Sequence, residues 1–148
     1  MFPITLLFID QNEERLGYFY RATKDIDRGV HCLLEKSGED ALLLLQEESA
    51  PAPDLIFVEH DTPGICGKDC VKSIKQLARH RHTPVILCTS QQRGSGNPRH
   101  PGVSGFLSRS LSLAELRNKL SVAFACFGLR APRRNKLETF MEEAPLEL

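Results

Sequence analysis

The chain has 148 residues, a length typical of a single domain that buries about two-thirds of the surface its unfolded form exposes. Its 19 lysines and arginines balance its 19 aspartates and glutamates, so no net charge attracts it to nucleic acid or to an anionic membrane. No apolar stretch approaches the roughly 20 residues of a membrane span. Met1-Phe2-Pro3 leads into strand-like sequence without a basic signal-peptide start, so we expect a cytoplasmic protein.

The first strand and helix are expected within residues 4–26. The apolar run 4–9 predicts a buried strand, and Asn12 is placed to cap a helix that begins at Glu13. Residues at helical spacing then predict the packing face of that helix: Leu16, Phe19, Tyr20, Thr23 and Ile26.

A second strand is expected over 30–34, followed by a helix that opens at Ser37 and ends at Gln46, before a proline-rich segment. The apolar run Leu55-Ile56-Phe57-Val58 predicts a third strand that is covered on both faces, as in a parallel sheet. This strand ends abruptly in Glu59-His60-Asp61 and a Thr-Pro-Gly turn. Ligands of parallel sheets bind at the carboxyl ends of strands, so this end is a candidate site.

The second half of the chain continues the alternation. We predict a helix over 67–80, a strand over 84–88, and a strand over 103–107. Three glycines and two prolines in residues 91–102 argue against a normal crossover helix there. Ser112, with Glu115 three residues later, is typical of the capping box of a last helix.

The composition changes after Gly128, from a basic stretch to an acidic one with a few apolar residues. We therefore predict a domain over residues 1–128 and a C-terminal tail over 129–148 that is either flexible or folds on a partner. The expected fold class is α/β: a flavodoxin-like, doubly wound sheet of five parallel strands in the order 2-1-3-4-5, with its fourth helix shortened or replaced by a loop.

This strand order brings the polar ends of four strands to one rim of the sheet. The residues expected there are Asp10 and Gln11, Glu59 and Asp61, Thr89 and Ser90, and Arg109.

The chain resembles the receiver domains of two-component response regulators over residues 4 to about 128. Four segments carry the resemblance in the right order: FIDQ at 8–11, PDLIFVE at 53–59 with Pro63-Gly64 and Gly67, TPVILCTS at 83–90, and GVSGFLSR at 102–109. The resemblance implies a signalling protein that binds a histidine kinase or an effector, or that forms a homodimer. It implies no enzymatic activity beyond phosphoryl acceptance.

The sequence departs from the family pattern at the residues that carry the chemistry. By the resemblance, Glu59 stands where an aspartate accepts the phosphoryl group, Gln11 replaces the second acidic residue, and Arg109 replaces a lysine. Asp10 and Thr89 keep the family's residue types, while Phe106 occupies the switch aromatic position without a phenolic hydroxyl.

These changes predict a weakened Mg²⁺ site, with Asp10, Glu59 and Asp61 as its remaining ligands and no other cofactor, because Gln11 removes one charged oxygen ligand. The longer Glu59 side chain misplaces the carboxylate for in-line attack. Instead, a Glu59–Arg109 ion pair would fix the site in one state. The alternatives are that Glu59 has simply drifted, or that Glu59 or Asp61 still accepts a phosphoryl group with Mg²⁺.

Five cysteines remain. Cys32, Cys88 and Cys126 lie in apolar runs typical of reduced core thiols. Cys66 and Cys70 stand four residues apart, but zinc sites usually contain two close pairs, so ordinary thiols are the favoured interpretation.

Overall fold

The computed structural model describes residues 3–61, 67–90, 101–110, 112–129 and 146–148. These residues form a parallel sheet in the order β2-β1-β3-β4-β5-β6. The strands are β1 (Thr5–Ile9), β2 (His31–Glu35), β3 (Leu55–Glu59), β4 (Val85–Thr89), β5 (Gly105–Ser108) and β6 (Leu146–Glu147). The helices are α1 (Glu13–Ile26), α2 (Gly38–Gln46), α3 (Gly67–Gln76), the 3₁₀ turn η1 (Ala78–His80) and α4 (Leu113–Cys126).

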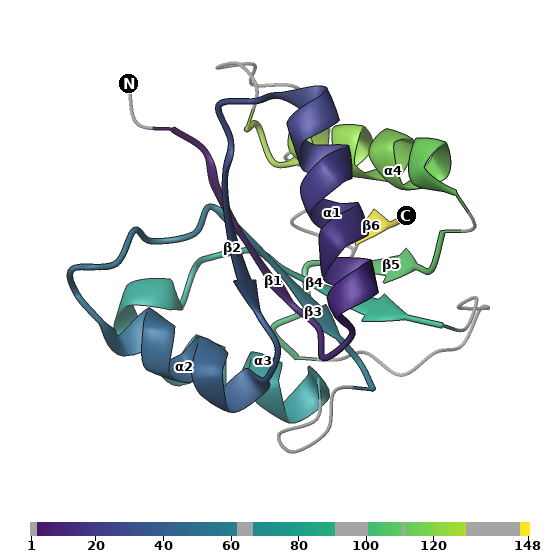
Figure 1. Cartoon of the computed structure of the whole chain (residues 1–148). Helices are drawn as coiled ribbons and strands as arrows, with labels where there is room; N and C mark the ends of the chain where they lie inside the picture. The colour runs from purple at the N-terminus through teal and green to yellow at the C-terminus, as the bar shows by residue number, and fades with distance from the viewer. Residues whose placement is uncertain (1–2, 62–66, 91–100, 111, 130–145) are drawn as a thin grey trace.

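The helices cover both faces of the sheet. Figure 1 shows α1 and α4 on one face and α2 and α3 on the other. The predicted α/β class and the strand order 2-1-3-4-5 are confirmed. Among the described residues, no helix is long and apolar enough to span a bilayer.

A sixth strand corrects the predicted number of five. Leu146 and Glu147 pair in parallel with Gly105 and Phe106, beside the edge of β5 (Figure 1). The backbones come so close that a Cβ atom on Gly105 would stand 2.8 Å from the carbonyl oxygen of Leu146. Two residues are too short a run to give a strand pattern, so the sequence offered no sign of β6. The rest of the predicted tail, residues 130–145, lies outside the described residues.

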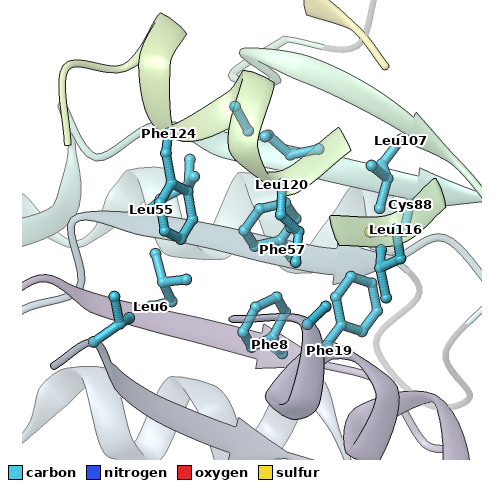
Figure 2. Packing of buried hydrophobic residues seen from close by; sticks show 14 of the residues in the cluster. Leu6, Phe8, Phe19, Leu55, Phe57, Cys88, Leu107, Leu116, Leu120 and Phe124 are labelled. Carbon is cyan, nitrogen blue, oxygen red and sulfur yellow. The ribbon is translucent and has the colours of Figure 1, made fainter. Parts of the chain in front are cut away.

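The core on the α1/α4 face is built around stacked phenylalanines. Phe8 of β1 lies between Phe19 of α1 and Phe57 of β3, with ring centroids 4.6 and 4.9 Å away. Figure 2 shows these rings beneath the leucines of α4. The three rings and the leucines above them are buried, which anchors α1 and α4 side by side on this face of the sheet.

Most predicted boundaries are correct within one or two residues. Asn12, Ser37 and Ser112 cap α1, α2 and α4, and each side chain accepts a hydrogen bond from a first-turn amide. The predicted helix 67–80 is shorter, because α3 ends at Gln76 before η1. The predicted loss of helix four falls on residues 91–102, of which 91–100 lie outside the described residues.

One packing prediction for α1 is wrong. Tyr20 is 44% exposed, whereas Ala22 is fully buried. Tyr20 lies at the edge of the apolar face, and its amphipathic ring tolerates water, so helical spacing alone did not place it correctly.

Candidate functional site

Register between the central strands brings the predicted polar residues together at one rim. Glu59 is the last residue of β3 and pairs with Cys88 of β4, while Thr89 pairs with Ser108 of β5. Arg109, directly after β5, donates its backbone N–H to the carbonyl oxygen of Thr89 at 3.0 Å. Each strand therefore delivers its terminal side chain to the same place.

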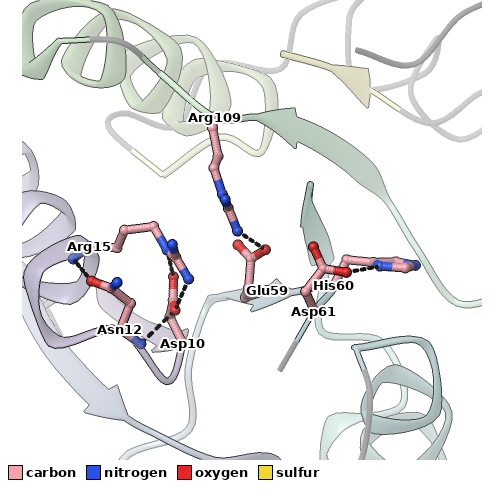
Figure 3. A network of polar contacts seen from close by, with 7 residues as sticks. All are labelled: Asp10, Asn12, Arg15, Glu59, His60, Asp61 and Arg109. Atoms are coloured by element: carbon pink, nitrogen blue, oxygen red, sulfur yellow. Dashed lines mark hydrogen bonds and ion pairs between the residues drawn. The ribbon is translucent and has the colours of Figure 1, made fainter. Parts of the chain in front are cut away.

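The Glu59–Arg109 ion pair predicted from the sequence is present. Arg109 Nη2 donates to Glu59 Oε1 at 2.8 Å (Figure 3). The Glu59 side chain is 2% exposed, whereas that of Arg109 is 38% exposed. The pair thus joins a buried carboxylate to a guanidinium that reaches the solvent.

A second arginine, which the sequence reasoning missed, holds the other buried carboxylate. Arg15 Nε donates to Asp10 Oδ2 at 2.7 Å, and Arg15 Nη2 donates to Asp10 Oδ1 at 2.9 Å (Figure 3). The backbone N–H of Asn12 also donates to Asp10 Oδ1. Such a two-pronged contact uses both oxygens of Asp10 and fixes the carboxylate in one orientation.

The position of Arg15 in α1 contains the signal that could have identified it. It is the third residue of the helix, and helical side chains tilt toward the helix N-terminus. A long cationic side chain in the first turn therefore reaches back over the end of β1, where Asp10 stands.

Burial sets the electrostatics of this rim. Burial raises the pKa of Glu59, and the nearby Asp10 carboxylate raises it further, while the hydrogen bond from Arg109 lowers it. The hydrogen bonds that Arg15 donates to the Asp10 carboxylate raise the pKa of Arg15. Burial, with Glu59 and Asp10 close by, raises the pKa of the Cys88 thiol well above its ordinary value. Cys88 therefore stays a neutral thiol at physiological pH, without nucleophilic character.

Solved structures resemble this arrangement of strands, although no protein-family model and no curated protein matches the sequence. The Mn²⁺-bound form of the response regulator Rcp1 gives a TM-score of 0.70 at 20% identity, over 90% of this chain and 99% of that one. The phosphorylated cyanobacterial phytochrome response regulator RcpA gives 0.73 at 17% identity, over 89% and 100%. The chemotaxis response regulator CheY4 of Vibrio cholerae gives 0.67 at 18% identity, over 82% and 98%. The chain has the receiver-domain fold.

Within this receiver-domain fold, the remaining predicted site residues divide into buried and exposed ones. Thr89 and Phe106 are 7% exposed, and Phe106 packs in the core on the α2/α3 face. Gln11, Asp61 and Ser90 are exposed. Asp61 Oδ1 lies 3.1 Å from His60 Nδ1, so its carboxylate turns toward His60, away from the Glu59–Arg109 contact (Figure 3). The receiver-domain rim thus brings Asp10, Glu59, Thr89 and Arg109 together and leaves Asp61 outside.

Gly67, the first residue of α3, lets this helix approach the end of β3. A Cβ atom there would stand 2.7 Å from His60 Cα and 2.8 Å from the Glu59 carbonyl oxygen. The Gly67 amide also donates to the His60 carbonyl oxygen at 3.1 Å. This contact fixes the backbone from which the Glu59 side chain projects.

The structure describes four of the five cysteines. Cys88 and Cys126 are buried and Cys32 is partly buried, and all three are free thiols, as predicted. Cys70 is also buried, whereas Cys66 lies outside the described residues. Within the segments that the structure describes, no three metal-binding side chains gather in one place.

Proposed function

We propose that the chain is an atypical receiver-like module of two-component signal transduction, which acts by binding other proteins largely without phosphorylation. The observation that carries the proposal is the occupation of both buried carboxylates at the rim by arginines: Asp10 by Arg15 and Glu59 by Arg109. The partner class is a histidine kinase or an effector, or a second copy of the chain. The proposed setting is cytoplasmic, with neither membrane nor nucleic acid as a partner.

The rim does not fit a Mg²⁺ ion. This ion requires several oxygen ligands in nearly octahedral geometry. Both oxygens of Asp10 accept hydrogen bonds from Arg15, and Oε1 of Glu59 accepts one from Arg109. Two permanent positive charges already balance the two carboxylates, so a dication would have to displace both guanidiniums. We therefore propose no cofactor.

The same two contacts disfavour Glu59 as a phosphoryl acceptor. Oε1, which accepts the Arg109 hydrogen bond, belongs to a side chain that is only 2% exposed, so a phosphoryl donor has little access to it. Without a metal, the developing charge of the transferred group has no dication to neutralise it. In our proposal the permanent Arg109–Glu59 ion pair holds the rim in one state, so that phosphorylation is not needed to reach it.

Intact-mass spectrometry tests the absence of phosphorylation. After incubation with acetyl phosphate and Mg²⁺, we expect one species of unmodified mass. The arginines occupy the carboxylate oxygens that Mg²⁺ would need, and Glu59 is too buried for the phosphoryl donor to reach. A single phosphoryl adduct would overturn the proposal. Peptide mapping of that adduct would then distinguish Glu59 from Asp61, the two candidate acceptors.

A binding measurement tests the interaction role. Immobilised chain is presented with dimerisation domains of histidine kinases and with soluble copies of itself, with and without acetyl phosphate and Mg²⁺. We expect binding to one of these partners with the same affinity under both conditions. Binding that requires the phosphoryl donor, or no binding to either class, would contradict the proposed role.

A further inference from the structure

A cavity lies between α1 and α4, beside the Glu59–Arg109 pair. Its volume is about 210 Å³. Its wall is apolar where Phe19, Leu107, Leu113 and Leu116 contribute, and its polar end is formed by the two arginines of the rim. The other lining residues are Tyr18, Glu59, Cys88, Ser110 and Ser112.

The charge that faces this cavity is positive. Arg15 and Arg109 line it together with a single carboxylate, Glu59, because Asp10 is not among the lining residues. In each ion pair the arginine side chain is more exposed than the carboxylate. The Arg15 side chain is 27% exposed and that of Arg109 is 38% exposed, whereas the side chains of Asp10 and Glu59 are each 2% exposed. A ligand in the cavity therefore meets two partly exposed cations and one buried carboxylate, Glu59.

The guanidiniums of Arg15 and Arg109 have N–H groups that their contacts with Asp10 and Glu59 do not use. Arg109 contacts Glu59 through Nη2 alone, and Arg15 contacts Asp10 through Nε and Nη2. Within the described part of the chain, Nε and Nη1 of Arg109 and Nη1 of Arg15 have no side-chain acceptor. A guanidinium offers five N–H donors, so an anionic group can be added without breaking either pair.

Ser110 supplies a further unsatisfied polar group. It lines the cavity, and its Oγ is buried without a hydrogen-bond partner among the described residues. Buried hydroxyl groups are normally hydrogen-bonded, and the hydroxyl can rotate about its own bond to meet a ligand oxygen. Ser110 therefore adds a hydroxyl donor to the lining of the cavity, next to Arg109 in the sequence.

We propose that this cavity binds a small organic monocarboxylate with an apolar body. The carboxylate lies against Arg109 and Arg15, and the body fills the space between Phe19, Leu113 and Leu116. A cavity of this size holds roughly the volume of one aromatic ring with its substituent, so an affinity on the order of 1 mM is expected for a minimal ligand. This site would exist whether or not the chain acts in signalling.

Benzoate is a suitable probe, with acetate and benzyl alcohol as matched controls. Acetate has the charge without the apolar body, and benzyl alcohol has the ring without the charge. Amide chemical shifts of the ¹⁵N-labelled chain are followed during each titration. We expect saturable shifts with benzoate at Phe19, Arg109, Ser110 and Leu113, and affinities about tenfold weaker for both controls.

Variants test the location. Leu113→Trp fills the cavity and should weaken benzoate binding about tenfold or more, whereas Val122→Trp should leave it unchanged. Val122 is the matched control because it lies on the same helix and is 47% exposed. If Leu113→Trp fails to fold, Ser110→Phe replaces it, since this residue also lines the cavity.

Three results would overturn the inference. These are the absence of a saturable benzoate shift, equal affinity for benzyl alcohol, and shifts that map away from the cavity. The failures of the two proposals are distinguishable. A phosphoryl adduct on the rim together with retained benzoate binding would overturn the signalling proposal alone. Absent benzoate binding together with an unmodified mass would overturn the cavity inference alone.

Discussion

Arg109 Nη2 lies 2.8 Å from Glu59 Oε1, and this contact joins the residue after β5 to the last residue of β3. The carboxylate is buried, so it depends on its partner more than a surface carboxylate would. Arg109 is 38% exposed, and water screens its charge, which reduces the contribution of the pair.

A double-mutant cycle on this pair should give a measurable coupling. We expect Arg109→Gln to lower the free energy of unfolding by about 1–2 kcal/mol, because it leaves a buried carboxylate without its cation. Glu59→Gln should cost less, since a neutral amide is cheaper to bury than an unpaired charge. Urea unfolding of both single variants and the double variant measures the coupling. Additive effects within error would mean that the pair contributes nothing.

Glu59 should also give the protein a characteristic pH dependence. Burial raises its pKa in the folded state above 4.5, the ordinary value. Between 4.5 and the folded-state pKa, the folded protein binds more protons than the unfolded chain, so stability falls as pH rises through this window. Above the folded-state pKa the contribution becomes constant. The difference in unfolding free energy between wild type and Glu59→Gln, measured against pH, isolates this group from the other carboxylates.

The Arg109→Gln background tests the cause of this pH dependence. Arg109→Gln removes the hydrogen bond that lowers the pKa of Glu59, so the window should extend to higher pH. A difference that instead increases with pH would mean that Arg109 outweighs burial and that the pKa of Glu59 is lowered in the folded protein.

Arg15 should be as important as Glu59 in excluding a metal. We expect Glu59→Asp alone to leave Mg²⁺ binding weak, because Arg15 still occupies both oxygens of Asp10. The triple variant Arg15→Gln, Glu59→Asp, Arg109→Lys frees both carboxylates and should bind Mg²⁺ about tenfold more tightly than Glu59→Asp, by isothermal titration calorimetry. Equal Mg²⁺ affinity of the single and triple variants would show that Arg15 does not block the site.

The sequence predicted the strands and the convergence of their ends well, because apolar runs that stop in polar residues are a local signal. Glu59 and Arg109 could be paired in advance for the same reason, since Glu59 ends β3, Arg109 directly follows β5, and the order of the strands was predicted correctly. Arg15 was missed because its role depends on the direction of a side chain in the first turn of α1. Asp61, which was grouped with Asp10, lies two residues beyond the end of β3, and its carboxylate contacts His60 in the structure. The β5–β6 pairing joins residues that are 41 positions apart, such as Gly105 and Leu146, and no local sequence pattern indicates such a contact.

The β5–β6 contact gives the sharpest test of the C-terminal strand. Gly105→Ala places a Cβ atom 2.8 Å from the Leu146 carbonyl oxygen and 3.0 Å from Leu146 Cβ, so β6 must move away. Leu146 and Leu148 donate their amides to Ser104 and Phe106, at 2.9 and 2.7 Å. We expect both amides to lose hydrogen-exchange protection in the variant, while the amides of β1 and β3 keep theirs.

Gly17→Ala is the matched control for this substitution. A Cβ atom at Gly17, within α1, meets nothing within 4 Å. The same chemical change should therefore stabilise α1 by about 0.5–1 kcal/mol and leave the protection of Leu146 and Leu148 unchanged. If Gly105→Ala keeps that protection as fully as Gly17→Ala does, then β6 does not approach β5 as closely as the structure indicates. If both variants lose it, the C-terminal strand responds to any perturbation of the domain, and its pairing with β5 is not the specific contact that holds it.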